Sequence, residues 1–177
     1  TAVAMSGGVD SSAAALLLLR EGRELLGLTL RLFNGGEEGT DAAAVAAQLG
    51  FPHRTLDMRR EFRSGVIDPF AAEYERGRTP NPCVLCNRAV KFGALLRKAE
   101  ELGCGRLATG HYARADYDAG AGRWLLKKAA HPDKDQSYVL AMLTQEQLSR
   151  ALFPLGELSK EEVRALALEA GLASAQK

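Results

Sequence analysis

The sequence predicts an α/β fold in which a parallel, twisted sheet carries helices on both faces. Two observations favour this class. Short apolar runs typical of buried strands alternate with longer segments typical of helices, and Gly-rich turns separate them. The expected order, β-α-β-α-β-α-α-β, is that of a Rossmann-like sheet. With 177 residues, 46% of them hydrophobic, the chain is long enough for one well-cored domain.

The first half of the chain is expected to supply three strands, each followed by a helix. The strands are expected near residues 2–5, 25–33 and 52–56, and the helices over residues 10–21, 41–49 and 61–75. The helix over residues 10–21 is apolar nearly all round, which predicts that it is buried. Thr40 is expected to cap the second helix and Gly50 to end it. A Gly- and Glu-rich loop is expected over residues 34–39.

The second half begins with a rigid Gly/Pro loop over residues 77–82. A helix over residues 84–102, ended by Gly103, and a strand over residues 106–109 are expected next. The pattern then changes, because two short runs flank Ala119-Gly120-Ala121-Gly122 and predict a small surface hairpin of residues 112–116 and 124–128. Two capping boxes predict C-terminal helices that open at Thr144 to Gln147 and at Ser159 to Glu162.

Composition and charge exclude some classes of protein. No uninterrupted apolar run reaches about 18 residues, so no membrane span is expected. Three cysteines without a visible signal peptide favour the cytosol over a disulfide scaffold. The net charge is only +1, but residues 54–98 hold ten Lys or Arg against five Asp or Glu. This basic segment either faces phosphates or forms solvated helix faces.

The strongest local signal is Ser6-Gly7-Gly8-Val9-Asp10-Ser11-Ser12, between a strand and a helix. Two glycines let the backbone approach a phosphate closely, and the helix N-terminus supplies free N–H groups. The three serines add hydroxyl donors, and Asp10 either orients Mg²⁺ or caps the helix. The segment lacks the Gly-Lys-Ser/Thr of a Walker A loop. A plain Gly turn with an Asp/Ser cap is the structural alternative.

The second signal is the loop from Gly77 to Asn87, which contains Cys83 and Cys86. Its two prolines stiffen the backbone ahead of a helix start. Cys86 is expected in the first helical turn, where the helix dipole lowers a thiol pKa. Such a thiolate is a nucleophile or a metal ligand. A buried structural cysteine, a zinc site and a redox pair stay open as alternatives. Cationic side chains that could favour the thiolate are Arg78, Arg88 and Lys91.

These segments resemble a known family. The segment from Ser6 to Ser12 resembles the phosphate loop of the PP-loop pyrophosphatases, which use ATP to adenylate an oxygen and release pyrophosphate. Thr79-Pro80-Asn81-Pro82, with Cys86-Asn87 and Lys91-Phe92, is similar to the hallmark of the tRNA-uridine 2-sulfurtransferases. Further similar segments are residues 108–112, 133–138 and 153–158. The resemblance covers essentially the whole chain and implies the adenine-nucleotide alpha-hydrolase type of fold.

The resemblance also implies roles for individual residues. Cys86 matches the proximal catalytic cysteine, and Asp10 is the expected catalytic carboxylate of the phosphate loop. The expected ATP-binding residues are Ala4, Met5, Ser6, Gly7, Gly8, Val9, Asp10, Ser11, Ser12, Leu30 and Gly110. The expected tRNA-binding residues are Asn81, Pro82, Cys83, Lys134, Asp135 and Gln136.

The implied reaction is ATP-dependent 2-thiolation of the wobble uridine of tRNA. ATP adenylates the uridine 2-oxygen, and a persulfide sulfur then displaces AMP. The implied cofactors are ATP and Mg²⁺, and the implied partners are tRNA and a persulfide-donating sulfur carrier protein, in the cytoplasm. The alternatives are another PP-loop ATP-dependent ligase, and an ATP- or tRNA-binding module without complete activity.

The chain departs from the family pattern in three places. The family's second catalytic cysteine follows the sequence that matches Leu172 to Lys177, where this chain stops. The loop near Asn34 to Gly39 is shorter than in the family. The central and C-terminal tRNA-binding domains are also absent. We therefore expect residues 1–143 to form the ATP-binding catalytic domain, and residues 144–177 to be a helical extension leading toward those domains.

Cys83 is ambiguous, since many relatives have Asp at this place. With Cys86 it forms a C-x-x-C pair, and both are candidate ligands of a [4Fe–4S] cluster because related thiolases use one. The third ligand would be the distal cysteine that the chain lacks. Two routes therefore stay open: Cys86 forms a disulfide during sulfur transfer, or it holds a cluster that carries the sulfide. Cys104 is expected in the core.

Overall fold

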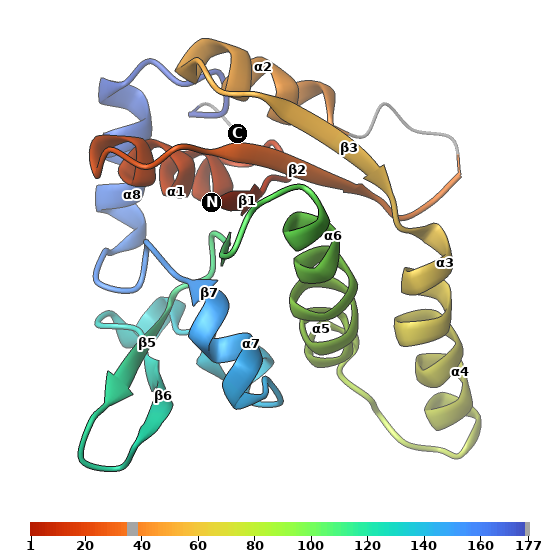
Figure 1. The fold of residues 1–177 in the computed structure, drawn as a ribbon. Coiled ribbons are helices and arrows are strands. Elements are labelled where there is room, and N and C mark those ends of the chain that lie inside the picture. The colour runs from red at the N-terminus through yellow and green to blue at the C-terminus, as the bar shows by residue number, and fades with distance from the viewer. Residues whose placement is uncertain (35–38, 176–177) are drawn as a thin grey trace.

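Five parallel strands form the main sheet in the order β3-β2-β1-β4-β7 (Figure 1). The computed structural model describes residues 1–34 and 39–175. The chain runs outward from β1 to β3 and then returns to the other side of β1 with β4. Such a switch point leaves a crevice at the carboxyl ends of the two central strands. The strands are β1 (Ala2–Ala4), β2 (Leu26–Arg31), β3 (His53–Asp57), β4 (Leu107–Ala108) and β7 (Ala151–Leu152).

The sheet is covered on both faces, as its apolar strands predict. In β1, Ala2 packs into one core and Val3 into the other, because successive side chains point to opposite faces. The first core includes Val90 and Leu95 from the long helix that carries the cysteines. The second includes Ala15 and residues of the helix after β2. The predicted parallel α/β sheet is confirmed.

Two helices follow β1 and β2. They are α1 (Val9–Arg20) and α2 (Thr40–Leu49). Most of α1 is buried, as its apolar sequence predicts. Gly50 ends α2 in the left-handed conformation as expected, but the N-cap of α2 is Gly39, so the assignment of Thr40 as the cap was wrong. The predicted loop near residue 34 falls largely on residues 35–38, outside the described residues.

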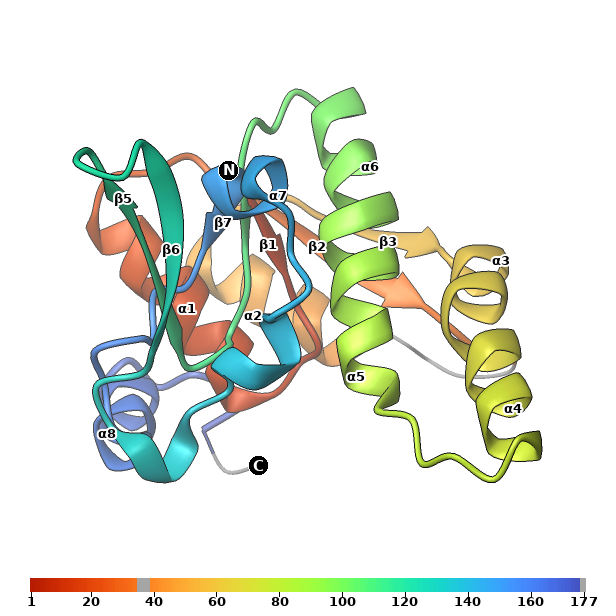
Figure 2. The same ribbon diagram turned by 90° about the horizontal axis from the view of Figure 1, so that it is seen from below.

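Two longer helical rods follow β3, and each contains a wider turn with i→i+5 hydrogen bonds (Figure 2). The first rod begins two residues before the expected position, and the second begins at Pro82. The first is α3 (Arg59–Phe62), η1 (Arg63–Ile67) and α4 (Asp68–Glu75). The second is α5 (Pro82–Leu85), η2 (Cys86–Leu95) and α6 (Leu96–Glu101).

The last third of the chain combines a hairpin with short helices. The predicted hairpin is confirmed as β5 (Ala113–Asp118) and β6 (Arg123–Lys128), with Trp124 packed edge-on against Tyr117 at 5.7 Å. Both predicted capping boxes are present, at Thr144 and Ser159. The helices of this region are η3 (Pro132–Lys134), η4 (Ser137–Leu140), α7 (Gln145–Arg150) and α8 (Lys160–Glu169).

Residues 144–177 were expected to be helical, but they also add β7 to the main sheet next to β4. The sequence expectation missed this strand because it pairs over only two residues. Helix α8 packs against α1, where Val163 and Ala167 lie in cores shared with Ala13 and Leu16. Among the described residues, none of the helices combines the length and the apolar character that a bilayer crossing requires.

Candidate nucleotide and cysteine site

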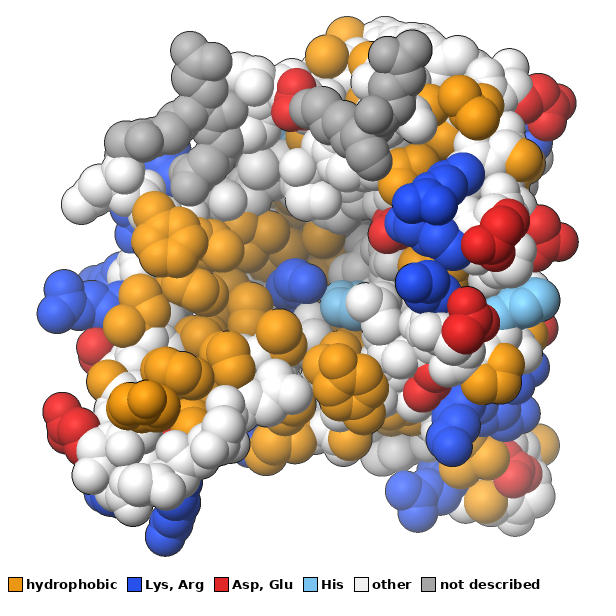
Figure 3. All heavy atoms as spheres, turned by 180° about the vertical axis from the view of Figure 1, so that it is seen from behind, with side chains coloured by type: hydrophobic (Ala, Val, Ile, Leu, Met, Phe, Trp, Pro, Cys, Tyr) orange, Lys and Arg blue, Asp and Glu red, His pale blue; other side chains and the backbone are white. Residues whose placement is uncertain are grey.

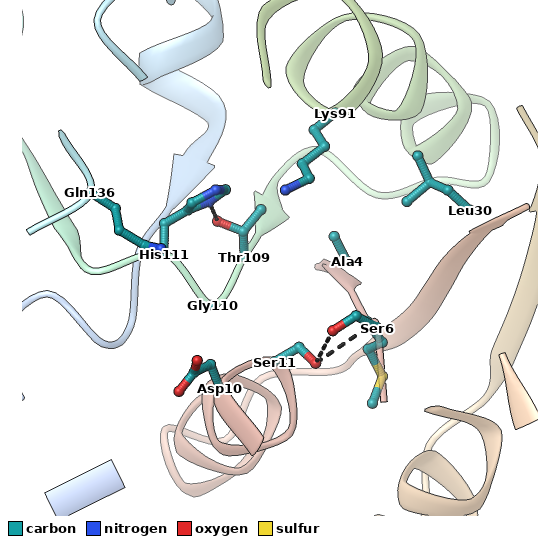
Figure 4. A pocket seen from close by; sticks show the side chains of 11 residues that line it. Ala4, Ser6, Asp10, Ser11, Leu30, Lys91, Thr109, Gly110, His111 and Gln136 are labelled. Atoms are coloured by element: carbon teal, nitrogen blue, oxygen red, sulfur yellow. Dashed lines mark hydrogen bonds between the residues drawn. The ribbon is translucent and has the colours of Figure 1, made fainter. Parts of the chain in front are cut away.

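A pocket of about 240 Å³ opens at the carboxyl ends of β1 and β4 (Figure 4). It therefore lies at the switch point of the sheet, where ligands of such folds bind. Seven residues that the sequence analysis assigned to ATP line it: Ala4, Met5, Ser6, Asp10, Ser11, Leu30 and Gly110. Four other residues complete the lining: Lys91, Thr109, His111 and Gln136.

The turn between β1 and α1 has the shape that close phosphate approach requires. Gly7 has φ +77°, a left-handed conformation that disfavours other residues. A Cβ atom at Gly7 would also lie 2.6 Å from Cβ of Asp41 in α2. Gly8 is the N-cap of α1 and has no side-chain cap, so the first N–H groups of this helix face the turn without a capping side chain.

The serines of this turn stabilise it from inside. The hydroxyls of Ser11 and Ser12 both donate to the carbonyl oxygen of Gly8, at 3.1 and 3.0 Å, and the Ser6 N–H donates to Oγ of Ser11 at 3.3 Å. Ser12 is fully buried and does not line the pocket, and Val9 packs in the core. Of the three serines of this turn, Ser6 and Ser11 line the pocket.

Asp10 is held by two partners from distant parts of the chain. Its Oδ1 accepts hydrogen bonds from the Tyr112 hydroxyl at 2.8 Å and from the Lys160 ammonium at 2.6 Å. Burial, and then the hydrogen bond to Asp10, raise the pKa of Tyr112, so this hydroxyl stays protonated and donates. Asp10 does not cap α1, so the alternative of an Asp cap is wrong.

Gly110, just after β4, lies against the turn from Ser6 to Ser12, which we call the phosphate turn. A Cβ atom at Gly110 would lie 2.9 Å from the carbonyl carbon of Asp10 and from the amide nitrogen of Ser11. Asp10 and Ser11 lie so close to Gly110 that a side chain at this position would clash with their backbone atoms. Glycine allows the pocket wall to approach α1 this closely. The sequence analysis assigned Gly110 to the nucleotide, and the geometry adds this contact with the first turn of α1.

His111 and Thr109 form a polar pair in the pocket wall. Oγ1 of Thr109 lies 2.7 Å from Nδ1 of His111, and both residues are buried. Burial, and to a smaller degree the nearby Lys91, lower the pKa of His111 to about 3. The imidazole is therefore neutral near pH 7 and cannot serve there as a cation for phosphate. The sequence offered only a weak signal for His111, its position directly after a strand end.

Lys91 enters the same pocket from η2, the helical segment that begins at Cys86. Figure 4 shows its side chain reaching toward Thr109 and His111, across the pocket from Ser11. From the sequence, Lys91 was expected only to favour a thiolate. Its place in the pocket depends on the wider turn of η2, which the sequence pattern did not predict.

The cysteine loop differs from the expectation in one physical respect. The helix begins with Asn81 as N-cap, whose Oδ1 accepts the Cys83 N–H at 3.0 Å, so Cys83 and not Cys86 lies in the first turn. Burial raises the pKa of the Cys86 thiol, and Lys91 lowers it by a smaller amount. The expectation that the helix start lowers the Cys86 pKa was wrong, because Cys86 is one turn further along and partly buried. Cys104 is buried in the core, as expected.

The three residues expected to bind tRNA after the hairpin, Lys134, Asp135 and Gln136, differ in their exposure and contacts. Lys134 is exposed in η3. Asp135 accepts hydrogen bonds from the N–H of Ala129 and from the Ser137 hydroxyl, both at 2.8 Å, so it shapes the loop. Gln136 lines the nucleotide pocket and accepts the Tyr112 N–H at 3.1 Å. Only Lys134 has the exposure that a phosphate contact in tRNA requires.

The described residues include few side chains that could bind a metal ion. Asp10 is the one carboxylate among the described residues that line the pocket, which fits Mg²⁺ bound by one carboxylate and substrate phosphates. No group of three or more His, Cys, Asp or Glu side chains gathers in the described part of the chain. Cys83 and Cys86 alone do not complete a [4Fe–4S] site, which takes four ligands.

On the face opposite to the view of Figure 1, hydrophobic and charged side chains are unequally distributed. Figure 3 shows hydrophobic side chains gathered on one half of this face and charged ones more densely on the other. Exposed aromatic residues near the cysteine helix include Tyr138, 62% exposed, in η4, which packs against α5. Exposed aromatic rings and cations are the groups on which single-stranded bases stack.

Curated relatives match nearly the whole chain. The tRNA-specific 2-thiouridylase MnmA 2 of Thermoanaerobacter sp. (strain X514) is 51% identical over 190 residues. The tRNA-specific 2-thiouridylase MnmA of Trichlorobacter lovleyi is 52% identical over 182 residues. Each match covers 99% of this chain but only 52% and 51% of the relative, so the chain spans about half the length of the curated relatives it matches.

Two solved structures share the fold. A predicted subunit of tRNA methyltransferase from Methanocaldococcus jannaschii has a TM-score of 0.59 at 20% identity, over 95% of this chain and 74% of that one. An NMN synthetase from Francisella tularensis has a TM-score of 0.59 at 16% identity, over 99% and 64%. At these identities the likeness concerns the fold alone. The family model described as the tRNA methyl transferase HUP domain matches residues 1–177, so the chain belongs to this family.

Proposed function

We propose that this chain is the ATP-binding catalytic part of an enzyme that replaces the 2-oxygen of a tRNA uridine with sulfur. One observation carries the proposal: the helix that contains Cys83 and Cys86 also provides Lys91 to the wall of the pocket. A nucleotide bound in the pocket would therefore lie beside the helix that carries both thiols. The roughly 50% identity to 2-thiouridylases over nearly the whole chain supports the same reaction.

The first proposed step is adenylation. The uridine O2 attacks the α-phosphorus of ATP, the new O2–P bond forms, and the bond from the α-phosphorus to the pyrophosphate oxygen breaks. Pyrophosphate leaves with the electron pair, and the uridine loses its N3 proton. Ala4 and Leu30 would contact adenine, the turn from Ser6 to Ser11 would face the phosphates, and Asp10 would hold Mg²⁺, which would supply positive charge there.

The second proposed step is sulfur transfer. The terminal sulfur of a cysteine persulfide attacks C2 of the adenylated uridine, and AMP leaves. The Cys86 thiolate then attacks the inner persulfide sulfur, which forms a disulfide and leaves the outer sulfur on the base. A thiol reductant resets the enzyme. We propose that the persulfide is borne by a cysteine that is not part of this chain, and that a sulfur carrier protein supplies its sulfur. We also propose a cytoplasmic location and a domain limit near residue 143.

The target base has to leave its stack to reach such a site. We propose that Asn81, Pro82 and Cys83 face the extruded base and that Lys134 contacts the tRNA backbone. The basic segment over residues 54–98 supplies further cations. Binding of tRNA should therefore weaken steeply as salt is raised, since phosphate contacts release counterions.

The test uses the protein that carries this chain, with tRNA, ATP and a persulfide donor. We expect ATP to yield AMP and pyrophosphate, and mass spectrometry to find 2-thiouridine in the tRNA. Cys86→Ala should abolish thiolation while adenylation remains measurable, and Cys83→Asp should keep part of the activity. Conversion of ATP to ADP, or adenylation of free uridine as fast as of tRNA, would contradict the proposal.

A further inference from the structure

Lys91 has an unusual environment for a lysine. It is partly buried in the pocket wall, and it is the one Lys or Arg among the described residues that line this pocket. The ammonium groups of Lys98, Lys127 and Lys160 each lie within 3 Å of a carboxylate oxygen. Within the described part of the chain, no carboxylate lies within ion-pair distance of Lys91, and burial lowers its pKa. A partly buried cation without an ion-pair partner loses part of its hydration, so this pocket suits an anionic ligand.

The direction of the Lys91 side chain depends on the wider turn of η2. Residues on both sides of Lys91 are held by one side chain from α7. Nε2 of Gln147 donates to the carbonyl oxygens of Arg88 at 3.1 Å and of Phe92 at 2.9 Å. Gln147 is itself fixed, because its Oε1 accepts the Thr144 N–H at 3.0 Å in the capping box of α7. Helix α7 thus clamps the turn that contains Lys91.

Gly93 gives the same turn its room. A Cβ atom at Gly93 would lie 2.9 Å from the carbonyl oxygen of Arg88, five residues earlier. Alanine at this position would push that carbonyl away and disturb the i→i+5 winding. The carbonyl of Arg88 is therefore enclosed between Gly93 and Gln147, and both contacts favour the winding that points Lys91 into the pocket.

We propose that Lys91 is a catalytic residue that binds the α-phosphate of ATP, and that Gln147 and Gly93 are positioning residues that aim it there. Lys91 faces the turn from Ser6 to Ser12 from the opposite wall, on the side of the helix that carries Cys83 and Cys86 (Figure 4). The α-phosphate is the group on which the O2–P bond forms and the bond to pyrophosphate breaks. An ammonium beside it stabilises the charge on the non-bridging oxygens during transfer.

The phosphate contact can be tested without tRNA. Calorimetry compares ATP with adenosine for the wild type, Lys91→Met and Lys91→Arg. A charge-assisted hydrogen bond contributes about 1.5–3 kcal/mol, so Lys91→Met should weaken ATP binding by about tenfold or more. Adenosine binding should stay within about twofold. Lys98→Met, on the same rod but exposed and paired with Glu101, is the matched control. ATP affinity in Lys91→Met equal to that of the wild type would overturn the proposal.

The catalytic role rests on the proposed function and is tested with tRNA in single turnover. Pyrophosphate release by Lys91→Met should fall by about 10²-fold or more at saturating ATP, as for loss of a transition-state donor. If the wild type releases no pyrophosphate with tRNA while Lys91→Met still loses ATP selectively, the proposed function fails and the phosphate contact stands. If Lys91→Met releases pyrophosphate at the wild-type rate, the catalytic role of Lys91 fails.

Gln147→Glu isolates the positioning role. Glutamate keeps the capping-box acceptor of α7 but loses the N–H donors and places an oxygen beside the carbonyl oxygens of Arg88 and Phe92, so the clamp on the turn is lost while the cap remains. We expect kcat to fall about tenfold with ATP affinity within about threefold, and Gly93→Ala to act in the same direction. Gln147→Glu with an unchanged kcat, or a variant that loses only thermal stability, would show a merely structural residue and overturn this part.

Discussion

The ammonium of Lys160 lies 2.6 Å from Oδ1 of Asp10 and joins the first turn of α8 to the first turn of α1. The two residues are 150 positions apart in the chain. Together with the Tyr112 hydroxyl, Lys160 fixes the only pocket-lining carboxylate of the described residues. The end of the chain therefore helps to set the geometry of its phosphate turn.

Asp10→Asn should separate magnesium binding from phosphate binding. The amide cannot bind the cation as a carboxylate does, so ATP affinity in Mg²⁺ should fall about tenfold. With EDTA the change should stay within about threefold, because the N–H groups of the turn remain. Calorimetry in both conditions measures this. Asp116→Asn, an exposed hairpin carboxylate paired with Lys127, is the control. An equal loss in EDTA would mean that Asp10 acts through its contacts with Tyr112 and Lys160 and not through magnesium.

Gly110→Ala should destabilise the protein and damage the pocket. The added methyl would lie 2.9 Å from backbone atoms of Asp10 and Ser11, and such overpacking costs about 1–3 kcal/mol. Urea titration should show a lower midpoint with an unchanged slope. Gly105→Ala is the matched control, because a Cβ atom there meets nothing within 4 Å. Equal stability of the two variants would contradict the close contact.

The cysteines should differ in alkylation by iodoacetamide, which attacks only the thiolate. Cys83 is exposed, whereas burial raises the pKa of Cys86 and leaves less thiolate at a given pH. Peptide mass spectrometry at pH 7.5 should therefore find Cys83 modified first and Cys104 last. Lys91→Met should slow Cys86 further, because Lys91 lowers its pKa, and Lys98→Met should not. Faster modification of Cys86 than of Cys83 would contradict this order.

His111 should make the protein less stable in acid. Its pKa is about 3 when folded, mainly through burial, and near 6.5 when unfolded. The unfolded chain therefore binds the extra proton as pH falls below 6.5, and stability is lost between pH 6.5 and 3. The loss should be about 1–2 kcal/mol from pH 6.5 to 5.

The variant His111→Asn should remove that part of the pH dependence, since its amide oxygen can replace Nδ1 as partner of Thr109. The exposed His131→Asn should leave it unchanged. Urea unfolding at pH 7 and pH 5 gives the comparison. A His111→Asn protein that loses as much stability as the wild type would refute this source of acid sensitivity.

Several local features could be predicted because their causes are local. The turn from Ser6 to Ser12 follows from two glycines between a strand and a helix, and both capping boxes follow from residues three apart. Two predictions of where a helix begins were wrong because a neighbouring residue takes the N-cap position. Thr40 was a plausible cap, but Gly39 takes that place, and Cys86 was placed one turn too early because Asn81 and Pro82 start the helix.

The sequence by itself determined the parallel α/β sheet, the phosphate turn and the presence of a cysteine pair at a helix start, since apolar periodicity, glycines and prolines act within a few residues. The tertiary structure alone added Lys91 and His111 to the pocket and placed Lys160 against Asp10. These three residues come from separate elements, and their approach to the turn from Ser6 to Ser12 depends on the order of strands around the switch point. It also decided the Cys86 pKa, because burial outweighs the nearby positive charge there.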